Sequence, residues 1–146
     1  MFAIINNYRL TFTFNGIFIN NNASVNAVSN SRTISSVTSV GLGVQSGADV
    51  LTGVTNNAAS TISGIQGITL RGAGSTIAGG INNAGTVTGT AGDGLLIDTN
   101  GSLAGGLTNS GTITGTGVGK HGVTIDNSAQ LSGGIINTGT ITGEQD

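Results

Sequence analysis

The chain has 146 residues, the size of one ordinary domain, and only 7% of them are charged and 3% aromatic. The net charge is −2 and the four basic residues are scattered, which argues against nucleic-acid binding. Cysteine is absent, so disulfides and thiolate metal sites are excluded, and no apolar run is long enough for a transmembrane helix. Abundant Ile, Val and Thr with little charge indicate an ordered, β-rich chain.

The first forty residues differ from the rest because they hold all four Phe residues and the only Tyr. Within them, RLTFTF-NG-IFIN places an Asn-Gly pair between two alternating stretches, a pattern typical of a β-hairpin. We predict that residues 1–40 form an N-terminal hairpin cap and a first irregular coil, and that residues 41–146 form one continuous repeat domain. Polar residues interrupt the early apolar stretch, so an exported protein is expected to start upstream of this chain.

Three short elements then recur along the chain. A triplet with a central Ile or Val returns at offsets of 28, 25, 26 and 28, at 33–35, 61–63, 86–88, 112–114 and 140–142. A second element starts at Gly41, Gly67, Gly94 and Gly122, and a third at Val50, Thr76, Ser102 and Gln130. The spacing predicts an all-β fold, a right-handed parallel β-helix with three short strands per 25–28-residue coil and about four to five coils.

Period-two alternation within each element predicts which side chains point into the core. The expected core pairs of the second element are Leu42/Val44, Ile68/Leu70, Leu95/Ile97 and Val123/Ile125. Those of the third are Ile77/Ile81, Leu103/Leu107 and Leu131/Ile135, and the first contributes Ile62, Val87, Ile113 and Ile141. Glycines such as Gly64, Gly89, Gly115 and Gly143 are expected at corners, and an asparagine ladder is expected at Asn57, Asn83, Asn109 and Asn137.

Two groups of residues raise the question of chemistry. Lys120 and His121 lie in GTGVGKHG, which lacks the spacing and the Ser or Thr of a phosphate-binding loop, so a longer corner loop is the favoured interpretation. Asp98 and Asp126 are repeat-equivalent and could stack as an acid–base pair, but solvated corner residues are favoured. No catalytic residue, metal site or cofactor is predicted, and the protein is not expected to be an enzyme.

The Thr and Ser residues that flank the central Ile or Val within each triplet form the one organised surface in this pattern. Ranks of hydroxyls and methyls are expected about 7 Å apart along each strand and about 4.8 Å apart between coils. Such Thr-x-Thr ranks resemble the ice-binding face of some β-solenoid antifreeze proteins, while Thr also simply suits an exposed β position. The candidate binding face consists of Thr61, Ser63, Thr86, Thr88, Thr112, Thr114, Thr140 and Thr142.

The phrase Gly-Gly-Ile/Leu-x-Asn-x-Gly-Thr-Ile/Val-Thr-Gly, followed by Gly-x-x-Ile and a Leu-x-Gly-Gly return, resembles bacterial autotransporter passenger repeats over roughly residues 41–143. The resemblance implies export to the cell surface of a Gram-negative bacterium, with membrane contact only through a C-terminal β-barrel that this chain lacks. It implies no shared catalytic residues. The chain is therefore expected to be a passenger fragment or a truncated relative.

These observations predict a non-enzymatic, extracellular β-helix stalk that supports adhesion. The alternatives are an ice-binding solenoid and, third, a polysaccharide lyase or hydrolase. Expected partners are a host-cell surface, the extracellular matrix or carbohydrate, and not nucleic acid. The uncapped C-terminus would also permit end-to-end self-association.

Overall fold

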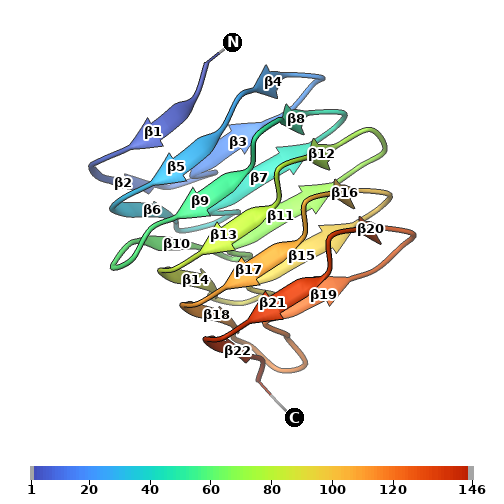
Figure 1. The fold of residues 1–146 in the computed structure, drawn as a ribbon. Helices are drawn as coiled ribbons and strands as arrows, with labels where there is room; N and C mark the ends of the chain where they lie inside the picture. Colours follow the sequence, from blue (N-terminus) through green and yellow to red (C-terminus); the bar gives the residue numbers. More distant parts are fainter. Residues whose placement is uncertain (1, 145–146) are drawn as a thin grey trace.

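The computed structural model describes residues 2–144 and shows a parallel β-solenoid of about five turns (Figure 1). Within this part of the chain there is no helix. Each strand pairs in parallel with its copies in the adjacent coils, and ladder partners lie about 26 residues apart, for example Ile62 and Val87. The predicted parallel solenoid with three strands per coil is therefore confirmed.

The strands stack into four ladders that run along the solenoid. Sheet A contains β1 (Ile4–Asn6), β5 (Val28–Asn30), β9 (Val54–Asn56), β13 (Ile81–Asn83), β17 (Leu107–Asn109) and β21 (Ile135–Asn137). Sheet B contains β2 (Arg9–Phe12), β6 (Thr33–Ser36), β10 (Thr61–Gly64), β14 (Thr86–Gly89), β18 (Thr112–Gly115) and β22 (Thr140–Thr142). Sheet C contains β3 (Ile17–Ile19), β7 (Leu42–Gln45), β11 (Ile68–Arg71), β15 (Leu95–Asp98) and β19 (Val123–Ile125). Sheet D contains β4 (Ser24–Val25), β8 (Asp49–Val50), β12 (Thr76–Ile77), β16 (Ser102–Leu103) and β20 (Gln130–Leu131).

The third predicted stretch of each coil spans two of these ladders, because it bends between sheets D and A. Gly80, Gly106 and Gly134 occupy the bend, with φ of 83°, 78° and 72°. An L-residue with a side chain rarely adopts this left-handed conformation, so glycine allows the chain to turn while strands on both sides stay in register. The bend also explains why each strand of sheet D has only two residues.

The core consists of the aliphatic columns that the alternation predicts. In the middle coils the inward residues of all ladders are fully buried, including Ile62, Leu70, Ile77, Leu95 and Ile113. The same columns become more accessible in the last coil, where Ile125 and Ile135 are more than two-fifths exposed. The buried positions are therefore predicted correctly along the stack, but burial is complete only where a coil has neighbours on both sides.

The predicted N-terminal hairpin is wrong. β2 and β3 lie in different sheets and pair in parallel with β6 and β7 of the next coil. Asn15 and Gly16 sit in the corner between them, and the backbone N of Gly16 donates to the Val40 carbonyl in the next coil. The Asn-Gly pair does not form a hairpin turn, because β2 and β3 each pair instead with a strand of the next coil. Residues 4–25 therefore form a regular first coil.

An asparagine ladder runs along sheet A, buried at Asn6, Asn30, Asn56, Asn83 and Asn109 and exposed at its last member, Asn137. Each Nδ2 donates to the Oδ1 of the next asparagine at 2.7–2.8 Å. The ladder is confirmed, but its predicted member Asn57 is wrong. Asn56 shares the inward face with Val54, whereas Asn57 lies just beyond the strand and bonds Ser31 at the surface.

Candidate functional site

The outward hydroxyls of sheet B form two straight ranks, as the repeat predicts. One rank runs through Thr33, Thr61, Thr86, Thr112 and Thr140, and the other through Ser35, Ser63, Thr88, Thr114 and Thr142. Parallel pairing sets the spacing at about 4.8 Å between coils and about 7 Å along a strand. We call this surface the hydroxyl face.

The hydroxyl face is accessible and carries no charged side chain over its five coils. Its side chains are half-buried from Thr33 to Thr114 and exposed at Thr140 and Thr142. Hydroxyls of neighbouring coils bond one another in places, with 3.2 Å between Oγ1 of Thr114 and Thr142. In the first coil, Arg9 takes the position of the Thr rank. The face offers a regular array of hydroxyl and methyl groups with little conformational freedom, since Thr is stiff at χ1.

Asp98 is not the solvated corner residue that the sequence predicts. Only 8% of Asp98 is exposed, whereas Asp126 one coil further is exposed as expected. The Nδ2 of Asn127 donates to Oδ1 of Asp98 at 2.6 Å, and an Arg71 guanidinium nitrogen lies 3.4 Å from Oδ2. Asp98 differs from Asp126 because Arg71 occupies the position aligned with Asp98 in the preceding coil and contacts its carboxylate.

These contacts hold the pKa of Asp98 below its usual value. The Asn127 amide is the largest cause, Thr99 and Arg71 act in the same direction, and burial opposes them. A general acid of a paired-carboxylate mechanism needs a raised pKa. The environment of Asp98 lowers its pKa and so favours the deprotonated carboxylate, which is opposite to what a general acid requires.

Lys120 and His121 lie in the loop between β18 and β19, which is two residues longer than the equivalent loop between β14 and β15. Both side chains are exposed. The backbone N of His121 donates to Oδ1 of Asp93 at 2.9 Å, and its ring nitrogen Nδ1 lies 3.7 Å from the same oxygen. The predicted longer corner loop is confirmed, with the loop held by Asp93 of the preceding coil.

A shallow groove of about 150 Å³ follows the bend between sheets D and A in the middle coils. Its lining includes glycines of the bend together with Thr55, Asn82 and Thr108. Within residues 2–144, no three His, Asp or Glu side chains gather in a group that could hold a metal ion.

The sequence reasoning missed the cluster of Arg71, Asp98 and Asn127. The signal was present, because an Arg and an Asp at aligned repeat positions must stack one coil apart, with opposite charges in contact.

Comparison with protein-family models, with curated proteins and with solved structures found no match for this chain. Among the described residues, no helix is long and apolar enough to cross a membrane.

Proposed function

We propose that this chain is a non-enzymatic β-solenoid stalk of an autotransporter-like surface protein, which supports adhesion outside a Gram-negative cell. The observation that carries the proposal is the unbroken register of every column. Apolar, amide and hydroxyl positions repeat from coil to coil, so successive coils present the same outward groups at the same spacing. Such stacking makes a stiff rod with an extended lateral surface, which suits display and many weak contacts.

The hydroxyl face is the surface that we assign to contact with a host cell, matrix or carbohydrate. Its ranks provide donors and acceptors at fixed intervals without charge, and hydroxyls of this kind bond equally well to sugar hydroxyls or amides. A single contact of this type is weak, so attachment depends on many coils acting together.

Adhesion is tested by displaying the 146-residue chain on a non-adherent bacterium and counting cells that remain on matrix- or glycan-coated surfaces after washing. We expect attachment above the empty display system and a large loss for Thr86→Glu/Thr112→Glu. The matched control is Asn82→Glu/Thr108→Glu, which adds the same two charges to the outer side of sheet A. Attachment equal to the empty system would contradict the proposal.

A separate assay addresses catalysis. We expect no release of reducing ends from a panel of acidic and neutral polysaccharides. Cleavage at measurable turnover that is abolished by Asp98→Ala or Asp126→Ala would replace the stalk with a carbohydrate-active enzyme.

Ice binding is the second candidate, favoured specifically by the two in-register ranks of the hydroxyl face. Flatness, rigidity and a regular lattice of hydroxyl and methyl groups are the properties that ordered water requires. At micromolar protein we would then expect inhibition of ice recrystallisation, lost in Thr114→Lys and kept in Thr108→Lys. Absence of inhibition by the parent chain removes this candidate.

A further inference from the structure

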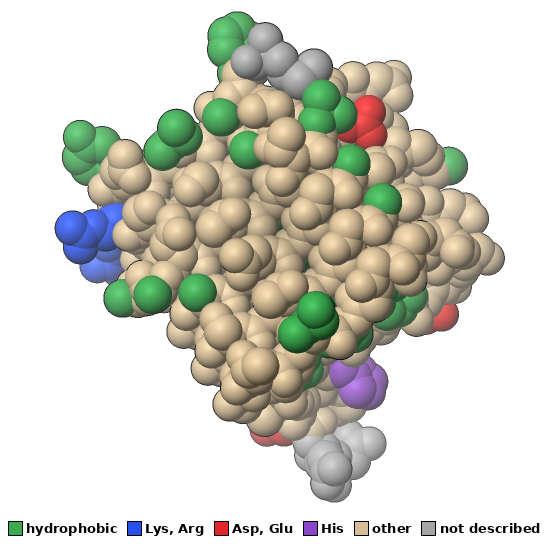
Figure 2. Space-filling view, in the orientation of Figure 1, with side chains coloured by type: hydrophobic (Ala, Val, Ile, Leu, Met, Phe, Trp, Pro, Cys, Tyr) green, Lys and Arg blue, Asp and Glu red, His purple; other side chains and the backbone are tan. Residues whose placement is uncertain are grey.

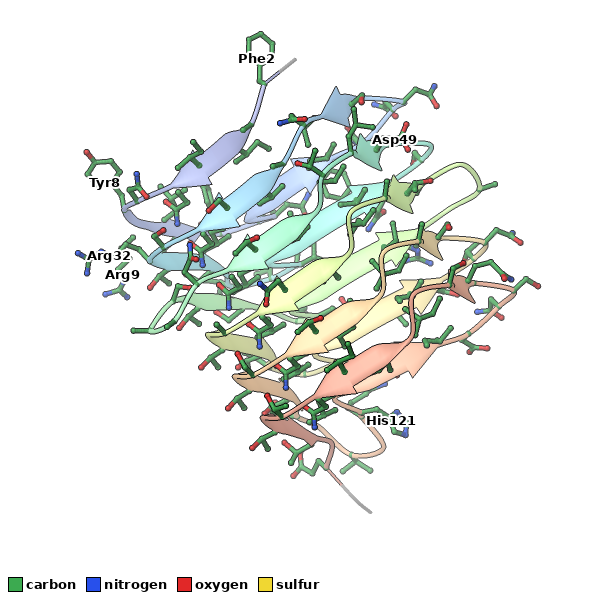
Figure 3. All side chains as sticks on the ribbon, viewed as in Figure 1. Phe2, Tyr8, Arg9, Arg32, Asp49 and His121 are labelled. Atoms are coloured by element: carbon green, nitrogen blue, oxygen red, sulfur yellow. The ribbon has the colours of Figure 1, made fainter. Side chains whose placement is uncertain are left out.

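The first coil exposes aromatic side chains that a folded protein usually buries. Phe2 is 83% exposed, Tyr8 78% and Phe14 74%. All five aromatic residues of the chain lie between positions 2 and 18, so this exposure is confined to one end of the described stack. Phe2 and Tyr8 project away from the body of the solenoid (Figure 3). Concentrated apolar exposure of this kind marks an interaction surface.

Two arginines lie beside Tyr8. The backbone N of Tyr8 donates to Asn6 of its own coil, and that of Arg32 donates to Asn30 of the next, so Tyr8 and Arg32 are at equivalent positions one coil apart. Arg9 follows Tyr8 and is exposed. Tyr8, Arg9 and Arg32 project together from the corner between sheets A and B (Figure 3), which is the blue region of an otherwise mostly uncharged surface in Figure 2.

The positive charge of this corner has no local compensation. The ion pairs formed among residues 2–144 involve Arg71 and His121, and not Arg9 or Arg32. Residues 1–48 contain these two arginines and no acidic residue, whereas residues 93–146 contain one lysine and five acidic residues. The chain is therefore electrically polarised along the solenoid, with its positive end in the coil that carries the aromatics.

We propose that this aromatic–arginine rim, formed by Phe2, Tyr8, Arg9, Phe14 and Arg32, docks the first coil on an anionic lipid surface. Aromatic rings favour the interface between headgroups and acyl chains, and arginines are attracted to anionic headgroups. The rim spans the first two coils, since Arg32 lies one coil after Tyr8, and the groove lies elsewhere, at residues 52–108. A fluid lipid surface can accept such separate protrusions, whereas a folded partner needs a shaped contact.

The probe is a pair of vesicle preparations, phosphatidylcholine alone and phosphatidylcholine mixed with phosphatidylglycerol. Tyr8 is the only tyrosine and tryptophan is absent, so intrinsic emission near the tyrosine maximum reports on Tyr8 alone. We expect co-sedimentation with the anionic vesicles, weakened by high salt, and reduced acrylamide quenching of Tyr8 in their presence. Equal binding to both preparations, or unchanged quenching, overturns the proposal.

Arg9→Gln/Arg32→Gln is the decisive variant, since both side chains are exposed and neither forms an ion pair within residues 2–144. We expect its partition coefficient on anionic vesicles to fall about 30-fold, the equivalent of about 2 kcal/mol for two basic residues. The matched control is Val118→Ser/Lys120→Gln, which removes one exposed apolar and one exposed basic side chain near the other end. Equal partitioning of the arginine variant and the parent overturns the proposal. So does binding to soluble polyglutamate without binding to vesicles, which would indicate an acidic protein partner instead.

Discussion

At the scale of single residues, the inward asparagines are held by several hydrogen bonds each. The Nδ2 of Asn83 donates both to Asn109 Oδ1 at 2.7 Å and to the Thr112 carbonyl at 3.1 Å, and its Oδ1 accepts from Asn56 at 2.8 Å. The second donation identifies the nitrogen unambiguously, because a carbonyl can only accept. Removing a buried amide of this kind is costly, because the groups it bonded are left without a hydrogen-bond partner and water cannot reach them.

We predict that Asn83→Leu destabilises the fold by about 2–5 kcal/mol, because Asn56 loses one acceptor and Asn109 one donor inside the core. The control is Asn82→Leu, the neighbouring and exposed residue of the same strand, with an expected change of about 0.5 kcal/mol or less. Urea unfolding of both variants measures the difference. Similar losses in the two variants would show that the ladder contributes little.

Asp98 predicts a pH dependence. Its pKa is lower in the folded protein than the ordinary value of 3.8, so its contribution to stability is present above that value and is lost as the pH falls through the folded pKa. Asp98→Asn should therefore lower stability near neutral pH by about 1–2 kcal/mol and flatten the loss of stability on acidification below about pH 4.

Urea midpoints at about pH 6 and about pH 3 measure this effect for the parent and for Asp98→Asn. Asp126→Asn is the matched variant, because it removes an exposed carboxylate from the same column. A larger flattening in Asp126→Asn than in Asp98→Asn would contradict the assignment.

Single residues also show why register is difficult to predict from sequence. Asn56 and Asn57 are adjacent, and both fit an asparagine repeat to within one position. The alternation of side chains along a strand distinguishes them. Asn56 lies two residues after the inward Val54 and therefore also points inward, as Asn83 does two residues after Ile81. Alternation should therefore take precedence over spacing when both are available.

At the scale of the elements, the bend between sheets D and A depends on backbone packed against backbone. A Cβ at Gly105 would lie 2.4 Å from the carbonyl carbon of Gly79 and the nitrogen of Gly80 in the preceding coil. Those atoms belong to the same bend in the preceding coil and cannot move without disturbing the ladders on either side. Close approach, and not only a left-handed conformation, thus dictates glycine here.

Gly105→Ala should destabilise the fold by about 3 kcal/mol, because the added methyl group cannot be accommodated without a backbone shift. Gly134→Ala is the informative comparison. It has φ of 72° but no atom within 4 Å of the added Cβ, so only conformational strain of about 1 kcal/mol is expected. Thermal unfolding compares the two variants, and a larger loss for Gly134→Ala would contradict the role of close approach.

The first coil shows how an element-scale signal fails. Alternating strands around Asn15 and Gly16 satisfy every local requirement of a hairpin, yet β2 and β3 pair with coil 2 instead. An isolated hairpin gives each strand one neighbour but buries little, whereas the stack provides a continuous apolar core. The sequence repeat starts clearly at residue 33, so the first coil is recognised only from its pairing in three dimensions.

At the scale of the whole molecule, stability should depend on position along the stack. Leu103 and Leu131 are the same residue type in the same column, one coil apart. Leu103 is fully buried between neighbouring coils, and Leu131 is only partly buried in the last coil. Repeat proteins of this kind gain their stability from contacts between adjacent coils.

We predict that Leu103→Ala costs about 2–5 kcal/mol and Leu131→Ala about 1 kcal/mol, because a cavity forms only where both sides are packed. Urea unfolding gives the two values, and amide hydrogen exchange should show the added opening of Leu131→Ala confined to residues after about 120. Equal costs at the two positions would indicate that the stack unfolds with no gradient along its length.

The parallel stack, its coil length and its aliphatic columns could be predicted because they repeat, and repetition averages out local ambiguity. Features that occur once could not. The bond from Asn127 to Asp98 and the exposed aromatics of coil 1 each depend on which neighbour the coil places opposite a single residue.

The direction of the asparagine ladder has an electrical consequence. Every amide points its N–H groups toward the following coil and its carbonyl toward the preceding one, so six side-chain dipoles add along one axis. Their negative pole lies in the first coil, which contains Arg9, and their positive pole lies toward the C-terminal coils, where acidic residues such as Asp126 and Glu144 outnumber the single lysine. The solenoid therefore has a dipole along its axis, and its charged side chains are distributed in the sense that stabilises this dipole.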